Sequence, residues 1–415
     1  MTRTRRRFVA FTILSAMFAT GYWWMTTAAA TPEQLTHGKM LFEHQWTVGD
    51  KLAGEGDGLG PVFNADSCVA CHFQGGVGGG GPNQNNVLAF QVIPMRGRRN
   101  VASGVVHSMA VLDELLESEL QVSTLFPMLT NRPSVRYTNE CGTYTYQPPD
   151  FDPVHFDTIN TPALFGAGLI DKINFASVQI HGVKRSLGAI SACLDGDMSQ
   201  MLAGRLKGRF GWKGQFNSLE GFVAAACAME VGLSNPLKPQ PIPGAQKPDE
   251  KAKWDMDRKQ LRDLVAFVAS LPAPKQVLPE DAKERQLVLH GETVFSRIGC
   301  ADCHTPNLGG INGLYSDLRL YDITQKIDTY GMVEDSEFKL PVSHPTFEEW
   351  KTPPLWGVAD SAPYFHDGGS PTLEDAIDRH GSSAANSQKQ FTLAGAPDRR
   401  DLLAFLKSLR APAMP

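Results

Sequence analysis

One short motif, which occurs twice, constrains this chain more than any other feature of its sequence. The pattern Cys-x-x-Cys-His is found at Cys68, Cys71 and His72 and again at Cys300, Cys303 and His304. At this spacing two thiols can bond the two vinyl groups of a haem while the adjacent imidazole reaches its iron. We therefore predict two covalently bound haem c groups, with His72 and His304 as iron ligands.

Two other kinds of site use paired cysteines. A four-cysteine zinc site contains two Cys-x-x-Cys pairs but needs no histidine after either pair. A redox dithiol needs a strand–helix–strand context and no trailing histidine. Haem is therefore the favoured interpretation. The other cysteines, Cys141, Cys193 and Cys227, are odd in number, and the sequence does not decide their pairing.

The first thirty residues are typical of an export signal. Four arginines within residues 3–7 precede an apolar run over residues 8–24, and small residues at 28–30 resemble a cleavage site. We expect either a cleaved signal peptide or an uncleaved N-terminal anchor over residues 1–30. Both place the protein in the periplasm, with the membrane contacted only through this segment if it is retained. The net charge of −5 argues against a nucleic-acid partner.

The two motifs lie within a longer internal repeat. Four further segments match in the same order: 37–42 with 290–295, 161–166 with 352–357, 212–220 with 366–374, and 262–271 with 400–409. The last segment of each half has helical periodicity and is followed by proline. We expect a mainly α fold with two tandem cytochrome c-like haem domains, at 31–274 and 275–415. Insertions and long loops, notably 75–81 and 130–160, enlarge the first domain.

The repeat also suggests what lies on the far side of each iron. Thr372 and Asp375 predict a helix start, and His380 follows two turns later, where it could bind the iron held by His304. The same count in the first half reaches Ala226, which cannot ligate iron. The first haem would then keep the open position that haem catalysis requires. Glu230, one turn beyond Ala226, could transfer protons there, although a solvated helix-end carboxylate is an equally good interpretation.

Trp212 occupies the position that His366 has in the second half. A large aromatic side chain in a glycine-rich loop could lie between the haems and relay electrons. An ordinary core tryptophan is the alternative.

These residues resemble the bacterial di-haem cytochrome c peroxidase superfamily. The series TPPLWGVA at 352–359, APYFHDG at 362–368 and TLEDA at 372–376 is similar to the family's C-terminal haem domain. The segments 58–64, 208–213 and 315–318 narrow the resemblance to the di-haem oxidoreductase, or thiol oxidoreductase-like, branch. The likeness covers nearly all of the chain after residue 30.

The resemblance implies roles for several residues. His380 stands where the family places its second-half iron ligand, usually methionine, and Trp212 matches the tryptophan between the haems. Glu230 falls two residues before the family's distal glutamate, and Phe222 replaces the distal glutamine, which argues against efficient peroxide turnover. The peroxidases also bind calcium between their domains, but no convincing ligand set is found here.

The leading expectation is a periplasmic, peroxidase-like oxidoreductase. Electrons from a small redox protein, of cytochrome c or cupredoxin type, would enter at the second haem, pass Trp212 and reduce peroxide or a similar oxidant at the first. One alternative is a protein-modifying di-haem oxidase. The other is a non-catalytic electron carrier, in which Met95, His107 or His181 would be the second axial ligand of the iron in the first haem.

Overall fold

The computed structural model describes residues 29–92, 103–113, 115, 135–139, 142–146, 154–174, 208–241, 253–323 and 349–413 of the 415-residue chain. The described α-helices are α1 (Pro32–Glu43), α2 (Cys68–Cys71), α4 (Ala167–Asp171), α6 (Leu219–Glu230), α7 (Arg258–Ser270), α8 (Ala282–Arg297), α10 (Leu373–Asp378), α11 (Ala385–Leu393) and α12 (Ala396–Ser408). The strands are β1 (Val62–Phe63), β2 (Val87–Val92), β3 (Ser103–Val106), β4 (Met109–Ala110), β5 (Val135–Asn139), β6 (Gly142–Tyr146), β7 (Val154–Ile159), β8 (Asn307–Leu308), β9 (Ile311–Asn312), β10 (Leu320–Asp322) and β11 (Glu349–Lys351).

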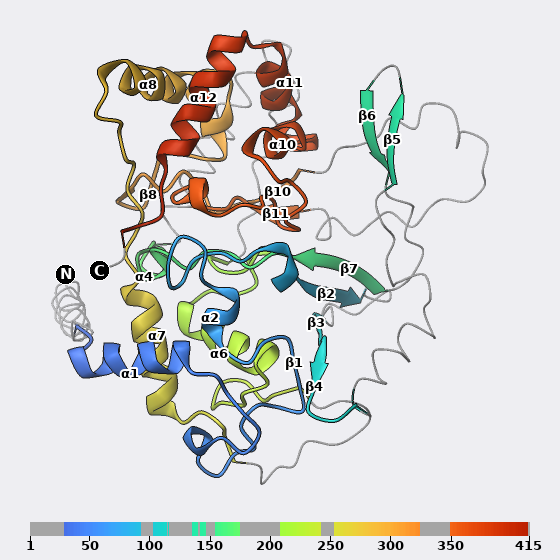
Figure 1. Ribbon diagram of the computed structural model, residues 1–415, viewed down its shortest axis with the longest axis vertical. Helices are drawn as coiled ribbons and strands as arrows, with labels where there is room; N and C mark the ends of the chain where they lie inside the picture. Colours follow the sequence, from blue (N-terminus) through green and yellow to red (C-terminus); the bar gives the residue numbers. More distant parts are fainter. Residues whose placement is uncertain are drawn as a thin grey trace, which may run out of the picture.

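Helices form most of the regular structure, as the sequence predicts, but the structure adds small antiparallel sheets. In Figure 1 the elements from α1 to α7 form the lower part of the molecule, and those from α8 to α12 form the upper part. The largest described sheet has the order β3-β2-β7 and lies in the lower part beside the upper one. The mainly α fold expected from the sequence did not include the strands that the structure describes between Val87 and Ile159. The central strand of the sheet, β2 (VLAFQV), is apolar at five of its six positions and so lacks the alternating pattern of a half-buried strand.

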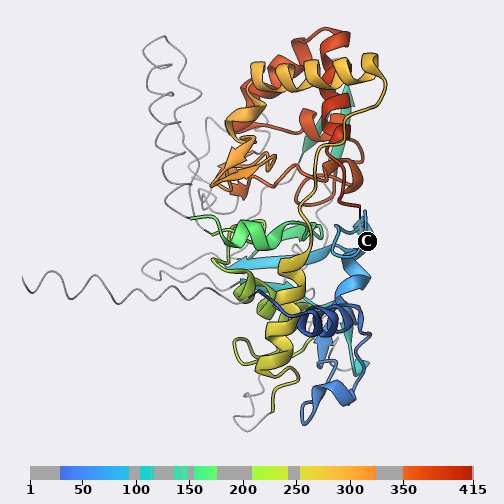
Figure 2. The same ribbon diagram turned by 90° about the vertical axis from the view of Figure 1, so that its left-hand side faces the viewer.

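Each half is built on the same crossing of two helices. Helix α1 crosses α7, and α8 crosses α12, as Figures 1 and 2 show. A Cβ atom on Gly38 would lie 2.0 Å from the carbonyl oxygen of Asp263, and one on Gly291 would lie 1.9 Å from that of Asp401. Only glycine lets the two backbones approach this closely.

The side chains around the two crossings also correspond. His37 Nδ1 contacts Asp263 Oδ2 at 2.7 Å, and His290 Nδ1 contacts Asp401 Oδ2 at 2.8 Å. Two phenylalanine rings, one from each helix, pack together at each crossing. The ring centroids are 5.4 Å apart for Phe42 and Phe267, and 5.3 Å apart for Phe295 and Phe405. The repeat read from the sequence is therefore confirmed at these contacts.

Two apolar clusters surround these crossings. One packs around Phe42 and Phe267, and the other around Phe295 and Phe405. Leu314 and Trp356, which follow the second Cys-x-x-Cys-His motif, pack into the first cluster. The two halves thus share apolar contact near both motifs.

Two capped helices carry the residues expected opposite the haems. Ser218 accepts a hydrogen bond from Gly221 N at the start of α6, and Thr372 and Asp375 form a reciprocal capping box at the start of α10. The predicted cap at Thr372 is confirmed. Helix α10 ends at Asp378, two residues before His380, whereas α6 continues through Ala226 to Glu230. Within the described part of the chain, no helix has the length and apolar character needed to cross a membrane.

Candidate functional site

The first motif forms the short helix α2 and places its histidine at the helix end. Ser67 precedes the helix, and His72 follows it. Nδ1 of His72 donates a hydrogen bond to the carbonyl oxygen of Gly79 at 3.1 Å. This bond fixes the tautomer and leaves Nε2 with a free lone pair, as an iron ligand requires. We call Cys68, Cys71 and His72 the front site.

The second motif repeats this arrangement. A single 3₁₀ turn holds Cys300 and the residues up to Asp302, and His304 follows. Nδ1 of His304 donates to the carbonyl oxygen of Tyr315 at 3.0 Å, so its Nε2 is also free. The Phe42 ring lies 6.3 Å from that of His72, and the Phe295 ring lies 6.5 Å from that of His304. We call the second set, together with His380, the rear site.

Burial keeps these groups uncharged. It lowers the pKa of His72 and that of His304 to about 4, so both imidazoles are neutral, the form that binds metal. Burial also raises the pKa of Cys71 to about 11, and the nearby charge of Glu230 adds to this rise. The Cys71 thiol is thus held as a neutral SH group, as the His72 imidazole is held in its neutral form.

His380 lies opposite His304, as the sequence predicts. The ring centroids are 6.4 Å apart. A metal–imidazole bond is about 2.0–2.1 Å long, so two imidazoles on opposite sides of one ion have centroids roughly 6 Å apart. Nδ1 of His380 donates to the carbonyl oxygen of Ala376 at 2.7 Å, which again leaves Nε2 free. The spacing and the tautomer both suit one iron between the two rings.

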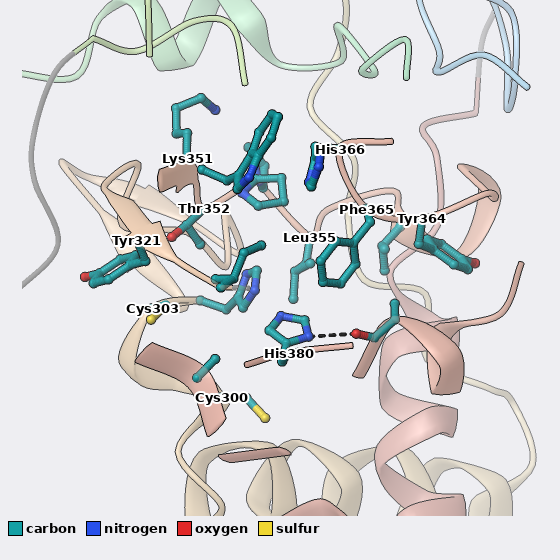
Figure 3. Close-up of a pocket in the computed structure, with 18 of the residues that line it drawn as sticks. Cys300, Cys303, Tyr321, Lys351, Thr352, Leu355, Tyr364, Phe365, His366 and His380 are labelled. Carbon is teal, nitrogen blue, oxygen red and sulfur yellow. Dashed lines mark hydrogen bonds between the residues drawn. The ribbon is translucent and has the colours of Figure 1, made fainter. Parts of the chain in front are cut away.

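A cavity of about 740 Å³ surrounds this pair. Figure 3 shows Cys300 and Cys303 toward one end, His380 in the middle, and Lys351 and His366 toward the other end. His366 Nδ1 is buried without a hydrogen-bond partner, and burial lowers the pKa of the Lys351 amine to about 8. The carboxylates of a porphyrin lie on the edge opposite its vinyl groups and would meet these two side chains. The volume, the thiols, the imidazoles and the unpaired nitrogen all fit haem.

Among the described residues, the His72 ring has a ring contact with Phe42 and none with a second imidazole. Ala226 lies within α6, at the position that corresponds to His380. Phe222 packs with Phe210 and Phe216, at centroid distances of 5.8 and 5.6 Å. Counted from the capping residues Ser218 and Thr372, the front half has alanine at the position where the rear half has His380.

Glu230 ends α6, and its charge acts on Cys71 of the front site. Its Oε2 accepts a hydrogen bond from Asn64 Nδ2 at 2.9 Å. Burial raises the pKa of Glu230, and the bond from Asn64 only partly opposes this. The fully solvated carboxylate considered from the sequence is wrong, because this side chain is partly buried and bonded. Asn64 belongs to the segment 58–64, whose sequence indicates no role for it in the site, and only the fold brings it to Glu230.

Trp212 lies where the two halves meet. Its Nε1 donates to the carbonyl oxygen of Asn160 at 2.8 Å, and its own carbonyl oxygen accepts from Lys351 N at 2.8 Å. Its ring centroid is 6.5 Å from that of His366, its counterpart in the repeat. His366 in turn stacks on Trp350, at a centroid distance of 3.4 Å. Trp350 and Lys351 had no predicted role, although both directly precede the conspicuous segment 352–357.

Several other predicted residues can be placed and some cannot. His107 Nε2 donates to the carbonyl oxygen of Met229 at 2.8 Å, and Cys227 is a buried free thiol in α6. Met95, Cys141, His181, Cys193 and the N-terminal segment lie outside the described residues. Across the described ranges, no group of three or more His, Cys, Asp or Glu side chains is arranged to hold a metal ion alone.

Comparison with known proteins gives one family match. Residues 196–409 match the family model described as "Di-haem oxidoreductase, putative peroxidase". The matched segment contains Trp212, Glu230 and the whole rear site, but not the front motif. A curated relative, hydrazine synthase subunit gamma of Kuenenia stuttgartiensis, is 27% identical over 148 residues, which cover 29% of this chain and 40% of the relative. The chain thus aligns with less than half of that relative's length.

Two solved structures have a limited likeness to this one. Hydrazine synthase of Kuenenia stuttgartiensis, pressurised with xenon, matches with a TM-score of 0.35 at 17% identity, over 61% of this chain and 73% of that one. A MauG-like protein associated with microbial copper homeostasis matches with a TM-score of 0.25 at 21% identity, over 36% and 52% of the two chains.

Proposed function

The chain belongs to the di-haem oxidoreductase family, and on this premise we propose that it is an exported, periplasmic c-type oxidoreductase that reduces a peroxide-class oxidant at its front site. The observation that carries this proposal is the difference between the two sites. A histidine faces His304 across the rear cavity, whereas the matching residue of the front half is Ala226. A site with one protein ligand leaves the other face of an iron free for a substrate.

The chain's own residues would hold both cofactors. The thiols of Cys68 and Cys71, and of Cys300 and Cys303, would form the thioether bonds. His72 would ligate the front iron, and His304 and His380 the rear iron. Lys351 and His366 would bind the carboxylates of the rear haem, because both line the far end of the cavity.

When bound, the two haems supply one-electron transfer from a small redox protein to the oxidant. The chain contributes a short aromatic connection between the halves, in which His366 contacts both Trp212 and Trp350. The hydrogen bonds of Trp212 to Asn160 and to Lys351 N hold its indole at this boundary. We propose that Trp212 carries electrons between the sites.

Glu230 would provide the protons that reduction of a peroxide consumes. Its carboxyl is partly buried, close to Cys71, and held by Asn64. Since burial raises its pKa, it keeps its proton to a higher pH than an exposed carboxyl. A group with this property can act as a general acid.

The proposal is tested by counting spin states in the purified ferric protein. We expect one low-spin rear haem and one high-spin front haem in the electron paramagnetic resonance spectrum, and oxidation of a reduced small donor on addition of peroxide. Two low-spin haems without a response to peroxide or cyanide would instead show a non-catalytic electron carrier.

Replacement of Glu230 by glutamine is expected to lower kcat/KM for peroxide by about 100-fold, within the range for loss of a general acid. Glutamine can still accept the bond from Asn64, so folding should be little affected. In the wild type, activity should fall as pH rises through the raised pKa of Glu230. This fall should be absent from the pH–activity profile of the variant. The control is Glu220→Gln, an exposed residue at the other end of α6. Equal activity and equal pH profiles for all three proteins would remove Glu230 from the reaction.

A further inference from the structure

The aromatic ring of Phe365 lies between His380 and an arginine. The ring centroids of Phe365 and His380 are 5.3 Å apart and nearly perpendicular, at 77°. The guanidinium carbon of Arg379 lies 4.3 Å from the centroid of the Phe365 ring. Arg379 directly precedes His380 in the chain, so an anchor on Arg379 also restrains the backbone of the histidine.

Asp367 supplies that anchor. Nη1 of Arg379 donates to Asp367 Oδ1 at 2.9 Å, and Nη2 donates to Oδ2 at 2.8 Å. A bidentate pair of this kind fixes the orientation of the guanidinium as well as its position. Burial alone would raise the pKa of Asp367, but the bonds from Arg379 outweigh it and hold the pKa below its ordinary value.

Phe365 adopts a backbone conformation that costs free energy. Its φ is +73°, in the left-handed region that large side chains rarely occupy. The corresponding residue of the front half is Gly211, with φ +79°. The two segments also correspond in three dimensions. Phe210 and Phe216 form an isolated antiparallel β-bridge, and Tyr364 and Ser370 form one at the matching positions of the rear half. The rear half therefore keeps a phenylalanine at a position where the front half has glycine, which adopts this φ without strain. Backbone strain of this kind persists where the side chain has a function.

The front half lacks every part of this arrangement. Gly211 replaces Phe365, Lys213 replaces Asp367, Ala225 replaces Arg379, and Ala226 replaces His380 itself. The histidine and its three supporting side chains are thus present together or absent together. A purely structural role would be needed in both copies of the fold.

We infer that Phe365, Asp367 and Arg379 form a clamp that positions His380 against the rear iron. The inference rests on the proposed function, because it takes His380 as the second ligand of that iron. The clamp acts through His380 and does not itself contact the iron. Its purpose is to keep the rear site closed to small ligands, so that oxidants react only at the front site.

The test uses Phe365→Gly in the full-length holoprotein. Glycine suits the local φ, so the fold should not be weakened by backbone strain, but the ring that presses on His380 is removed. In the fully reduced protein, carbon monoxide binds the rear haem only after His380 leaves. Binding of carbon monoxide to the rear haem therefore appears as a slow kinetic phase, which is followed after flash photolysis. We expect the rate constant of this slow phase to rise about 10- to 100-fold in the variant, the size of effect usual for supporting residues of a metal site. The front phase should not change.

Further variants separate positioning from simple loss of packing. Phe365→Tyr retains the ring and should restore the slow phase. Arg379→Gln should accelerate it as Phe365→Gly does, which gives a second test if the glycine variant folds poorly. If both Phe365→Gly and Arg379→Gln bind carbon monoxide at the wild-type rate while His380→Ala binds it fast, the clamp is wrong and the ligand assignment stands. If His380→Ala also behaves as wild type, the proposed function itself fails.

Discussion

Replacing His380 with alanine is expected to convert the rear haem from a low-spin to a high-spin state and to leave the front haem unchanged. The reason is geometric. The centroid of the His380 ring lies 6.4 Å from that of the His304 ring, and its Nδ1 donates to the Ala376 carbonyl oxygen, so Nε2 is the nitrogen that would ligate the iron. Alanine removes this nitrogen and leaves one axial ligand. The spin states are measured by electron paramagnetic resonance and by the absorption spectrum, with the front haem as a control in the same molecule.

Two additions sharpen this prediction. Free imidazole should enter the space left in the His380→Ala protein and restore the low-spin signal. His380→Met should raise the midpoint potential of the rear haem by on the order of 0.1–0.3 V, because methionine favours the ferrous state relative to histidine. A rear haem whose spin state and potential are the same in all three proteins would mean that His380 is not a ligand.

The covalent haem attachment proposed for both sites could be predicted from the sequence because it depends on local spacing. Two thiols and an imidazole within five residues define a haem site without reference to the rest of the fold. His380 could be anticipated for a similar reason: the cap at Thr372 sets the start of α10, and the histidine lies a fixed distance beyond it. His304, which would ligate the same iron as His380, is brought opposite it only by the fold.

The supporting residues could not be predicted in this way. Asp367 and Arg379 are twelve residues apart, and nothing local signals that they pair. Phe365 carries no sign in the sequence of its left-handed φ, and Lys351 looks like an ordinary strand lysine until the fold places it in the lining of the cavity. The sheet β3-β2-β7 was missed because its strands pair across long insertions. Where a function depends on contacts between distant segments, only the three-dimensional structure supplies them.

The repeat gives the chain an internal comparison. Both halves retain the helix crossing, the Cys-x-x-Cys-His turn and a phenylalanine packed against the proximal histidine. They differ on the opposite side of the site, where the rear half has His380 and its clamp and the front half has alanines. The shared parts are those that would hold a haem, and the differing parts are those that would decide what its iron can bind.

The helix crossings should be the most sensitive points of the fold. In Gly291→Ala the new methyl group would lie 1.9 Å from the Asp401 carbonyl oxygen and 2.9 Å from Phe405 Cβ. Neither backbone can yield without separating α8 from α12, and Phe295 and Phe405 would lose their packing with them. Overpacking alone costs about 1–3 kcal/mol, and the disturbed aromatic contacts add to this, so we expect about 3 kcal/mol in total. Gly38→Ala should have the same effect on the front half, where α1 meets α7.

The change is measured by thermal unfolding of the holoproteins, followed separately by far-ultraviolet circular dichroism and by the haem absorption band. A loss of this size should lower the Tm of the affected half by about 6–12 °C. Gly221→Ala is the matched control, because only Ser218 Oγ lies within 4 Å of its added methyl group, at 3.2 Å, and alanine favours a helix by about 1 kcal/mol. Since each half has its own crossing, Gly291→Ala should disrupt the histidine ligation of the rear haem at a lower temperature than that of the front haem, and Gly38→Ala should reverse that order. Unchanged Tm values in both variants would mean that the helices do not cross as closely as these glycines require.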